Sequence, residues 1–202
     1  MSHADFQLII WLGFAVLITL VWSVITYNKL VHLRNLINES WSNVDTELRR
    51  RYDLIPNLIE VVKGYAIHER NVLESVTKAR AEAMNYSGPQ NEQASRENQL
   101  IHSIKDLLAV SENYPELKAD QQFLKLQREL VNTEDRIQAA RRFYNGNVRD
   151  YNNLALSFPS SIIAGCFGFT RANYFEIEEA ISRAVASVFS EHSKNQSQNR
   201  LI

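Results

Sequence analysis

The feature that most constrains this chain is a long uncharged segment near its N-terminus. Residues 6–28 are 23 consecutive residues without a charged side chain, and 13 of them are Leu, Ile, Val or Phe. As a helix the run spans about 35 Å, enough to cross a hydrocarbon core of about 30 Å. The 13 apolar side chains contribute about −4 to −8 kcal/mol toward insertion. We therefore assign residues 1–28 to an N-terminal transmembrane anchor.

Two other interpretations of this segment are a cleaved signal peptide and a buried core helix. A signal peptide begins with basic residues and ends at small residues. Here Asp5 is the only charged residue before the run, and bulky side chains occupy 24–27. Lys29 and Arg34 follow the run closely, and no basic residue precedes it. The positive-inside tendency then predicts an outside N-terminus and cytoplasmic residues 29–202.

The rest of the chain has a composition typical of long helices. Six glycines and four prolines in 202 residues are less than half of average usage. Because 22 basic residues face 23 acidic ones, a basic surface for nucleic acid is not expected. Cys166 is the single cysteine, which excludes an intrachain disulfide and a cysteine-built zinc site.

Apolar residues recur every three or four positions from Leu30 to about residue 85, which predicts one very long helix with a kink or restart at Pro56. Turn residues at 86–89 and 113–115 separate it from helices over about 90–113 and 116–157. Asn173 and Glu176 form a capping-box pattern that predicts a last, short helix. The fold class is therefore all-α, an antiparallel bundle of about four helices over 29–189. Residues 190–202 are polar and are predicted to be disordered.

Motifs for catalysis or metal binding are not recognisable in the sequence. His68-Glu69 begins like a zincin motif, but Val72 stands where the second histidine is required. No Glu-x-x-His pair, phosphate loop or nucleophile motif is found, and Cys166 in its apolar surroundings is interpreted as a packed residue. We therefore expect no enzyme activity, no catalytic or metal-binding residue, no cofactor and no small-molecule substrate.

Two surfaces are candidates for interaction. The stripe from Leu30 to Leu48 extends beyond the reach of the shorter helices, and an exposed stripe would favour a homo-oligomer. Arg, Asn and Tyr also gather on one face of the third helix, which favours a polar network or an oligomer contact. A solvated face would explain them too, and an anion-binding role is a further alternative. The candidate face comprises Leu30, Leu33, Ile37, Trp41, Val44, Arg49, Arg50, Arg51, Arg141, Asn145, Arg149 and Asn152. The uncharged stretch 158–169 either packs under a turn of the bundle or contacts membrane or a partner.

Several blocks of sequence, taken in order, resemble the LemA family of bacterial membrane proteins. They are Tyr-Asn-Lys-Leu-Val at 27–31, Trp-Ser-Asn-Val-Asp at 41–45, Arg-Arg-Tyr-Asp-Leu-Ile-Pro-Asn-Leu at 50–58, Glu-Asn-Tyr-Pro-Glu-Leu-Lys-Ala at 112–119, Arg-Arg-Phe-Tyr-Asn at 141–145 and Val-Arg-Asp-Tyr-Asn at 148–152. The resemblance implies a single-pass protein of the bacterial inner membrane, a cytoplasmic helical bundle and no established enzymatic activity. Relatives are often encoded beside membrane metallopeptidases or TPM-domain proteins, which implies such partners.

Two functional hypotheses follow. The first is a non-enzymatic, membrane-anchored scaffold or adaptor that acts through protein–protein interaction and assembles with itself. The alternative is an accessory or regulatory subunit of a membrane-bound peptidase or another membrane complex. Both expect the lipid bilayer as a partner, and neither expects nucleic acid.

Overall fold

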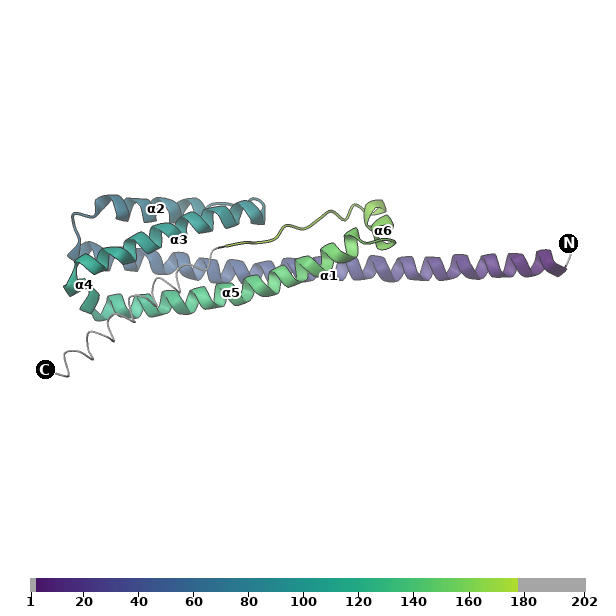
Figure 1. Ribbon diagram of the computed structural model, residues 1–202, viewed down its shortest axis with the longest axis horizontal. Coiled ribbons are helices and arrows are strands. Elements are labelled where there is room, and N and C mark those ends of the chain that lie inside the picture. Colours follow the sequence, from purple (N-terminus) through teal and green to yellow (C-terminus); the bar gives the residue numbers. More distant parts are fainter. Residues whose placement is uncertain (1–2, 178–202) are drawn as a thin grey trace. The chain divides into compact units, whose positions relative to one another are not determined.

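The computed structural model describes residues 3–177, and every regular element among them is a helix (Figure 1). The helices are α1 (His3–Tyr65), α2 (Arg70–Met84), α3 (Gln90–Asn113), α4 (Pro115–Ala119), α5 (Gln121–Leu156) and α6 (Ser160–Cys166). The predicted all-α fold class with a very long first helix is confirmed. The described residues form two compact units, which we call the anchor unit (3–40 and 145–172) and the bundle unit (41–144 and 173–177).

The N-terminal part of α1 is long and apolar enough to cross a membrane. An 18-residue window there has a mean hydropathy of 2.0, and only 6% of it is buried. The side-chain hydroxyls of Thr19 and Ser23 donate to the carbonyls of Ala15 and Thr19, at 2.9 and 2.7 Å. Because these hydroxyls are satisfied within the helix, they add little to the cost of placing it in lipid.

Within the anchor unit, α1 is covered by the rest of the unit from Thr26 onward. Ile25 is 60% exposed, whereas Thr26 is only 6% exposed. The Tyr27 ring lies 4.7 Å from the ring of Phe167 and 5.7 Å from that of Phe169, centroid to centroid. The end of α5, α6 and the segment after it supply this cover (Figure 1).

In the bundle unit the predicted stripe of α1 is the core. Its members Val44, Leu48, Tyr52, Ile55 and Val62 are almost fully buried, whereas Ile59 is only partly buried and Leu58 takes its place in the core. On α3, the buried side chains Leu100, Ile104, Leu107 and Leu108 form a matching stripe. Helices α2 and α3 pack against each other as a hairpin joined at 85–89. This is the arrangement that amphipathic helices with short connections favour.

The prediction of one helix from the anchor to residue 85 is wrong, because α1 ends at Tyr65 and α2 begins at Arg70. The turn between them is closed by bonds from Ala66 N to Val62 O (2.9 Å) and from Glu69 N to Ala66 O (3.2 Å). Across this turn Ala66 and Leu73 are still seven residues apart, which equals two turns of a helix. Hydrophobic periodicity alone therefore could not reveal the break between the helices.

Pro56 does not end a helix, because α1 continues through it. A proline lacks the N–H that would bond the carbonyl four residues earlier, here that of Tyr52. The Arg80 Nε on α2 donates to this carbonyl at 2.7 Å. The bond removed by the proline is thus replaced by a tertiary one, which ties α2 to α1.

The third predicted helix, 116–157, is divided into α4 and α5 at Asp120. The Asp120 carboxylate accepts from the amides of Gln122 (2.8 Å) and Phe123 (2.9 Å), as an N-cap does. The bond from the Phe123 amide is the main cause of a lowered pKa for the Asp120 carboxyl. Near the C-terminus, residues 173–177 are not helical, so the predicted cap at Asn173 is wrong. The rest of that predicted helix and the tail 190–202 lie outside the described residues.

Candidate functional site

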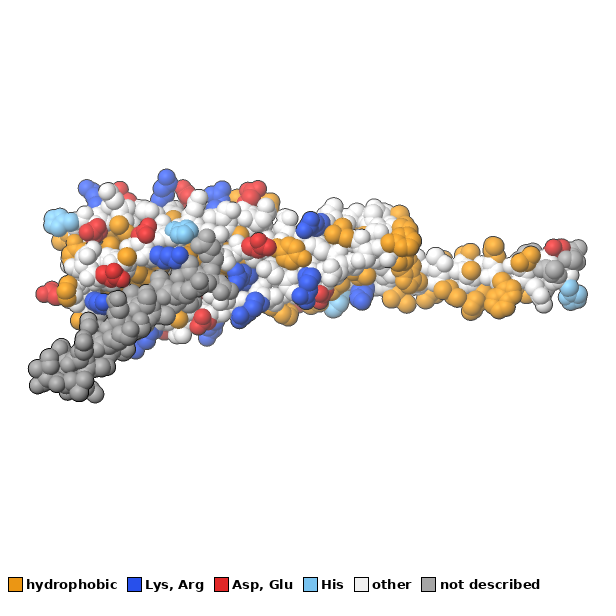
Figure 2. Space-filling model, in the orientation of Figure 1, with side chains coloured by type: hydrophobic (Ala, Val, Ile, Leu, Met, Phe, Trp, Pro, Cys, Tyr) orange, Lys and Arg blue, Asp and Glu red, His pale blue; other side chains and the backbone are white. Residues whose placement is uncertain are grey.

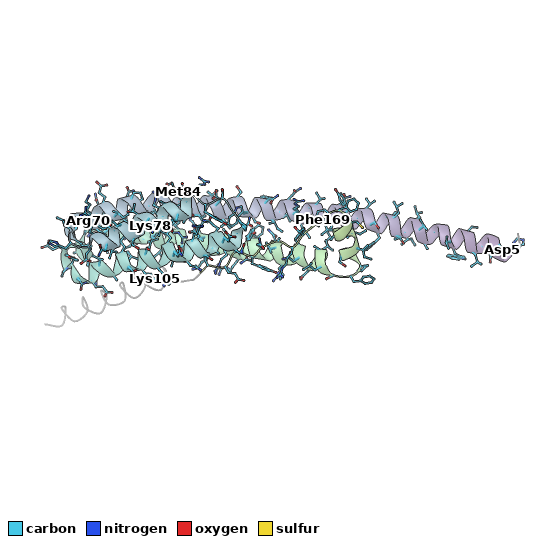
Figure 3. All side chains as sticks on the ribbon, turned by 90° about the horizontal axis from the view of Figure 1, so that it is seen from above. Asp5, Arg70, Lys78, Met84, Lys105 and Phe169 are labelled. Carbon is cyan, nitrogen blue, oxygen red and sulfur yellow. The ribbon has the colours of Figure 1, made fainter. Side chains whose placement is uncertain are left out.

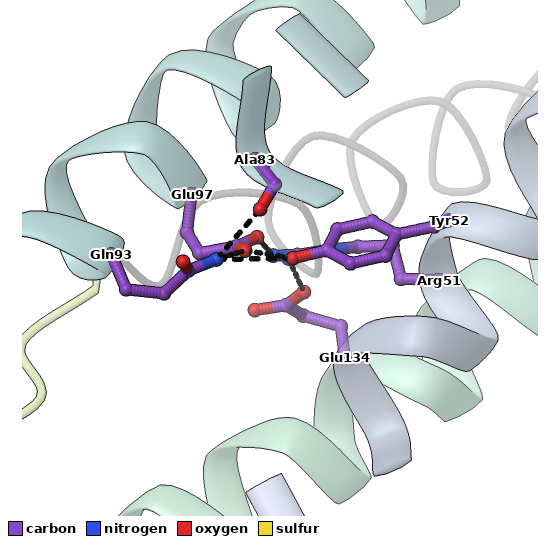
Figure 4. A network of polar contacts seen from close by, with 6 residues as sticks. All are labelled: Arg51, Tyr52, Ala83, Gln93, Glu97 and Glu134. Atoms are coloured by element: carbon purple, nitrogen blue, oxygen red, sulfur yellow. Dashed lines mark hydrogen bonds and ion pairs between the residues drawn. The ribbon is translucent and has the colours of Figure 1, made fainter. Parts of the chain in front are cut away.

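A charged cluster lies in the interior of the bundle unit, where α1, α3 and α5 meet (Figure 4). We call it the Arg51 centre, comprising Arg51, Tyr52, Gln93, Glu97 and Glu134. Arg51 is 0% exposed and donates through Nη1 to the Glu134 carboxylate at 2.9 Å. Its Nη2 donates to the Glu97 carboxylate, which also accepts from the Tyr52 hydroxyl.

Gln93, on α3, links the Arg51 centre to α2. Its Nε2 donates to the Glu97 carboxylate at 2.6 Å and to the Ala83 carbonyl on α2 at 3.1 Å. It also lies 3.2 Å from the Tyr52 hydroxyl oxygen. One guanidinium and one amide therefore join four helices at the same level of the bundle.

Burial sets the electrostatics of the Arg51 centre. Loss of solvent opposes the charge of Arg51, but the Glu97 and Glu134 carboxylates outweigh it, so the Arg51 pKa is raised. Burial raises the pKa of the Glu134 carboxyl, with Arg51 acting in the opposite direction. Burial and the nearby Glu97 carboxylate raise the pKa of the Tyr52 phenol, which stays protonated as a donor. Two buried carboxylates and one guanidinium make this part of the core strongly dependent on each partner.

Several buried side-chain polar atoms of the described residues have no hydrogen-bond partner. Two of them, Glu134 Oε1 and Arg51 Nε, belong to the Arg51 centre, and the others include Glu47 Oε2 and both side-chain polar atoms of Gln127. These atoms are shielded from solvent. The geometry of the Arg51 centre is that of a structural clamp, and the described residues contain no group of three or more His, Cys, Asp or Glu that could hold a metal ion.

Arg51 was predicted to lie on an interaction face together with Arg49 and Arg50. The two neighbours are exposed, with Arg49 paired to Asp45 at 2.8 Å and Arg50 lying 3.7 Å from Glu129. Arg51 is instead inside, so its assignment to a surface is wrong. It occupies a stripe position, three residues after Leu48 and four before Ile55, and that placement was the available signal.

Glu97 and Glu134 were missed altogether. Each interrupts an apolar stripe: Glu97 precedes Leu100 and Ile101, and Glu134 stands between Leu130 and Ile137. A charged residue at a core position of a helix is rarely tolerated unless it is paired. Together with Arg51 on α1, these charged residues at core positions could have indicated that the three side chains meet.

The apolar part of the predicted face is largely covered by the chain itself. Leu30, Ile37 and Val44 are buried, and Leu33 and Trp41 are partly buried. The premise of an uncovered stripe is therefore wrong, because α1 ends at Tyr65 instead of near residue 85. Its part after residue 28 is then about as long as α5, and α6 follows α5 as further cover. In the bundle unit Trp41 packs against Tyr144 and Phe175, with ring centroids 5.4 and 5.2 Å apart.

The polar part of the face on α5 holds the non-helical segment that ends the described chain. In the bundle unit Arg141 donates to the Ile177 carbonyl, and the Tyr144 hydroxyl donates to the Asn173 carbonyl at 2.8 Å. In the anchor unit the buried Asn152 donates to the Ala172 carbonyl at 3.0 Å and accepts from its amide at 2.9 Å. Asn145 is half-buried.

Arg149 alone of this group is fully at the surface, 3.3 Å from Asp150. A single exposed ion pair of this kind contributes little. Of the alternatives predicted for the α5 face, these bonds favour a polar network within each unit.

The surface of the bundle unit has an apolar hollow, which we call the α1–α2 groove. It measures about 720 Å³ and lies between the end of α1 and the length of α2. Its lining residues are Ile59, Lys63, Ile67, Arg70, Leu73, Glu74, Thr77, Lys78 and Ala81. Figure 3 labels Arg70 and Lys78, which mark the α2 side of this groove.

Known proteins are similar in sequence to this chain over most of its length. The LemA family model matches residues 40–189. Magnetosome protein MamQ 1 of Paramagnetospirillum magneticum is 25% identical, over 76% of this chain and 66% of that protein. Magnetosome protein MamQ of Magnetospirillum gryphiswaldense is 22% identical, over 89% of this chain and 76% of that protein. Protein LemA of Metamycoplasma hominis is 29% identical, over 67% of this chain and 58% of that protein.

The chain thus spans only about two thirds of the length of the Paramagnetospirillum protein. The family match covers 150 of the 202 residues, and these include the Arg51 centre and the α1–α2 groove. With a helix long and apolar enough to cross a membrane ahead of this region, the chain belongs to the LemA family.

Proposed function

We propose that this protein is a membrane-anchored, non-enzymatic scaffold or adaptor that binds another protein through the α1–α2 groove. The observation that carries the proposal is the groove itself. It is an apolar hollow on a bundle whose other large apolar side chains are mostly buried. Ile67 stands at its edge and is 72% exposed. A contiguous apolar patch on an otherwise polar surface often marks an interaction site, whereas apolar residues scattered singly over a surface do not.

The chemistry of the groove indicates the kind of partner. Ile59 and Leu73 provide an apolar floor, whereas Lys63, Arg70 and Lys78 give it a basic rim. Glu74 is the single acidic residue of the lining, and it pairs with Arg70 at 3.2 Å. A groove of this kind fits the apolar face of an amphipathic helix flanked by acidic residues.

Membrane anchoring supports an adaptor role. A chain held in one plane meets partners of the same membrane at a raised local concentration, so a modest groove suffices for binding. The cations behind the span favour a bundle on the cytoplasmic face of a bacterial inner membrane, with the N-terminus outside. Reporter fusions at the C-terminus test this: a cytoplasmic reporter is expected to be active, and an active periplasmic phosphatase would reverse the orientation.

The identity of the partner separates the two hypotheses. Because Leu30, Ile37 and Val44 are buried, a homo-oligomer cannot be inferred from that stripe. A second copy could instead offer a segment to the groove. The alternative is a membrane peptidase or TPM-domain protein, for which the chain would be an accessory subunit.

Site-specific photo-cross-linking in living cells tests the proposal. A photoreactive residue is placed at Ile67 or Thr77 on the groove, and at Ala109, an exposed position of α3, as the matched control. We expect one discrete adduct from both groove positions and none from Ala109. The charge reversal Lys78→Glu should weaken the adduct at Thr77. Equal adducts at all three positions, or none, would refute groove binding, and mass spectrometry of the adduct tells a second copy from a peptidase.

A further inference from the structure

An apolar patch on the anchor unit is used by neither the Arg51 centre nor the α1–α2 groove. Figure 2 shows hydrophobic side chains gathered around α6, at the end of the unit from which α1 continues toward its N-terminus. We call it the α6 patch, comprising Leu156, Phe158, Ile162 and Phe167. Phe158 is 82% exposed, and the other three are more than half exposed.

We propose that the α6 patch inserts into the interfacial region of the same bilayer that α1 crosses. The anchor unit would then contact lipid twice, through the span and through α6. The proposal concerns this unit alone and is independent of what the α1–α2 groove binds.

The position of the patch along α1 carries the proposal. Tyr27, next to the end of the uncharged run 6–28, packs directly on Phe167 and Phe169. Figure 3 labels Phe169 beside α1. Tyrosines at such positions lie at the level of the lipid headgroups. The α6 patch is therefore held at the level of the lipid headgroups of the bilayer that surrounds the span.

The segment that bears the patch is suited to partial burial in lipid. Residues 158–169 contain no charged side chain. Moving this apolar surface from water into the interfacial region lowers the free energy in proportion to the area transferred. In solution the same surface stays exposed to water.

Its backbone is also closed on itself, so insertion leaves few polar groups unsatisfied. The Phe169 amide donates to the Ala164 carbonyl at 2.9 Å, and Gly168 N lies 3.4 Å from Gly165 O. Gly168 has φ +71°, the left-handed conformation that ends a helix in this way. At the other end of α6 the Ser160 hydroxyl donates to the Leu154 carbonyl at 2.6 Å. Unpaired backbone groups would have made contact with lipid costly.

Charges on the water side of the patch fit a lipid surface as well. Lys29 and Arg34 follow Tyr27 on α1, and Arg171 follows Phe169. Cations just outside the hydrocarbon region are attracted to anionic headgroups. A bilayer accounts for both the apolar patch and the cations that follow Tyr27 and Phe169 in the sequence, because the span places that bilayer beside α6.

Cys166 is exposed, so its interpretation as a packed residue is wrong. It gives a direct probe, since it is the single cysteine and lies in α6. The full chain is reconstituted in vesicles of phosphatidylethanolamine and phosphatidylglycerol with a nitroxide on Cys166. Collision rates with oxygen, which concentrates in lipid, and with a water-soluble nickel complex are then measured. The matched control carries the label at Asn35→Cys in a Cys166→Ala background. Asn35 is exposed on the same unit, about 12 Å farther along α1 from Tyr27.

We expect the oxygen-to-nickel collision ratio to be several-fold higher at Cys166 than at Asn35→Cys. Phe158→Ser should lower the ratio at Cys166, whereas Phe143→Ser, which removes an exposed phenylalanine from the bundle unit, should leave it unchanged. A ratio at Cys166 equal to that at Asn35→Cys would overturn the proposal. So would dipolar broadening of the Cys166 spectrum that disappears on dilution with unlabelled protein, because a second copy would then cover the patch.

Discussion

Replacing Arg51 by Met tests whether the Arg51 centre holds the bundle unit together. The substitution keeps most of the side-chain volume but leaves the Glu97 and Glu134 carboxylates buried without their cation. Removing one partner of a buried ion pair typically costs about 3–5 kcal/mol. For a chain of this size that corresponds to a fall in melting temperature of about 6–20 °C. The assay is thermal unfolding of the full chain in detergent, followed by circular dichroism.

The pH dependence of the Arg51→Met variant distinguishes unpaired charge from a packing defect. A carboxyl whose pKa is higher in the folded state stabilises the fold below the unfolded pKa of about 4.3 and loses that contribution as the pH rises through the folded pKa. Without Arg51 to oppose burial, the pKa of Glu134 should rise further. The deficit of the variant against the parent should therefore be largest at neutral pH and shrink on acidification.

Two matched variants complete this experiment. Arg49→Met removes an exposed cation paired with Asp45 and should leave the melting temperature unchanged. Converting Arg51, Glu97 and Glu134 together to apolar residues should recover much of the loss, because no buried charge is left unpaired. An Arg51→Met variant as stable as the parent at neutral pH would refute the reasoning, and so would a deficit that does not change with pH.

Three further outcomes are expected. Leu107→Ala, at a fully buried position of α3, should lower the free energy of unfolding by about 2–5 kcal/mol in chemical denaturation. Asn152→Leu should cost about 1–3 kcal/mol, because it orphans the amide and carbonyl of Ala172, and should raise protease sensitivity after Phe169; an unchanged digestion pattern would contradict this. Burial raises the pKa of Tyr144 to about 12, so stability from this phenol should be present below pH 10 and lost between pH 10 and 12; ultraviolet absorbance showing ordinary ionisation of every tyrosine near pH 10 would count against it.

Hydrophobic periodicity predicted the helices well because each buries one stripe. Val44, Leu48 and Ile55 on α1 and Leu100 and Ile104 on α3 lie in the core as their spacing indicated. The boundaries were harder to predict. The turn at 66–69 keeps the stripe in phase, and Pro56 stays helical because Arg80 replaces its missing bond.

The polar residues could be predicted least. Arg51 was predicted to lie on an interaction face with Arg49 and Arg50, whereas its burial depends on carboxylates 46 and 83 residues away. Asn152 and Arg141 were also assigned to an outer face, but they bond a non-helical segment that the sequence predicted as the start of a helix. Pairing over such distances is set by tertiary packing, which spacing along one helix does not encode.

The most direct test of the scaffold function is the mass of the particle that contains this protein when it is extracted from its own membrane in native nanodiscs. Binding through the α1–α2 groove predicts a protein mass well above the 23.3 kDa of one chain. It also predicts that Ile67→Glu, which places an acidic group on the exposed edge of the groove, releases the additional mass, whereas Ala109→Glu retains it. A particle holding a single 23.3 kDa chain would contradict the proposed function, as would an assembly that Ile67→Glu leaves intact.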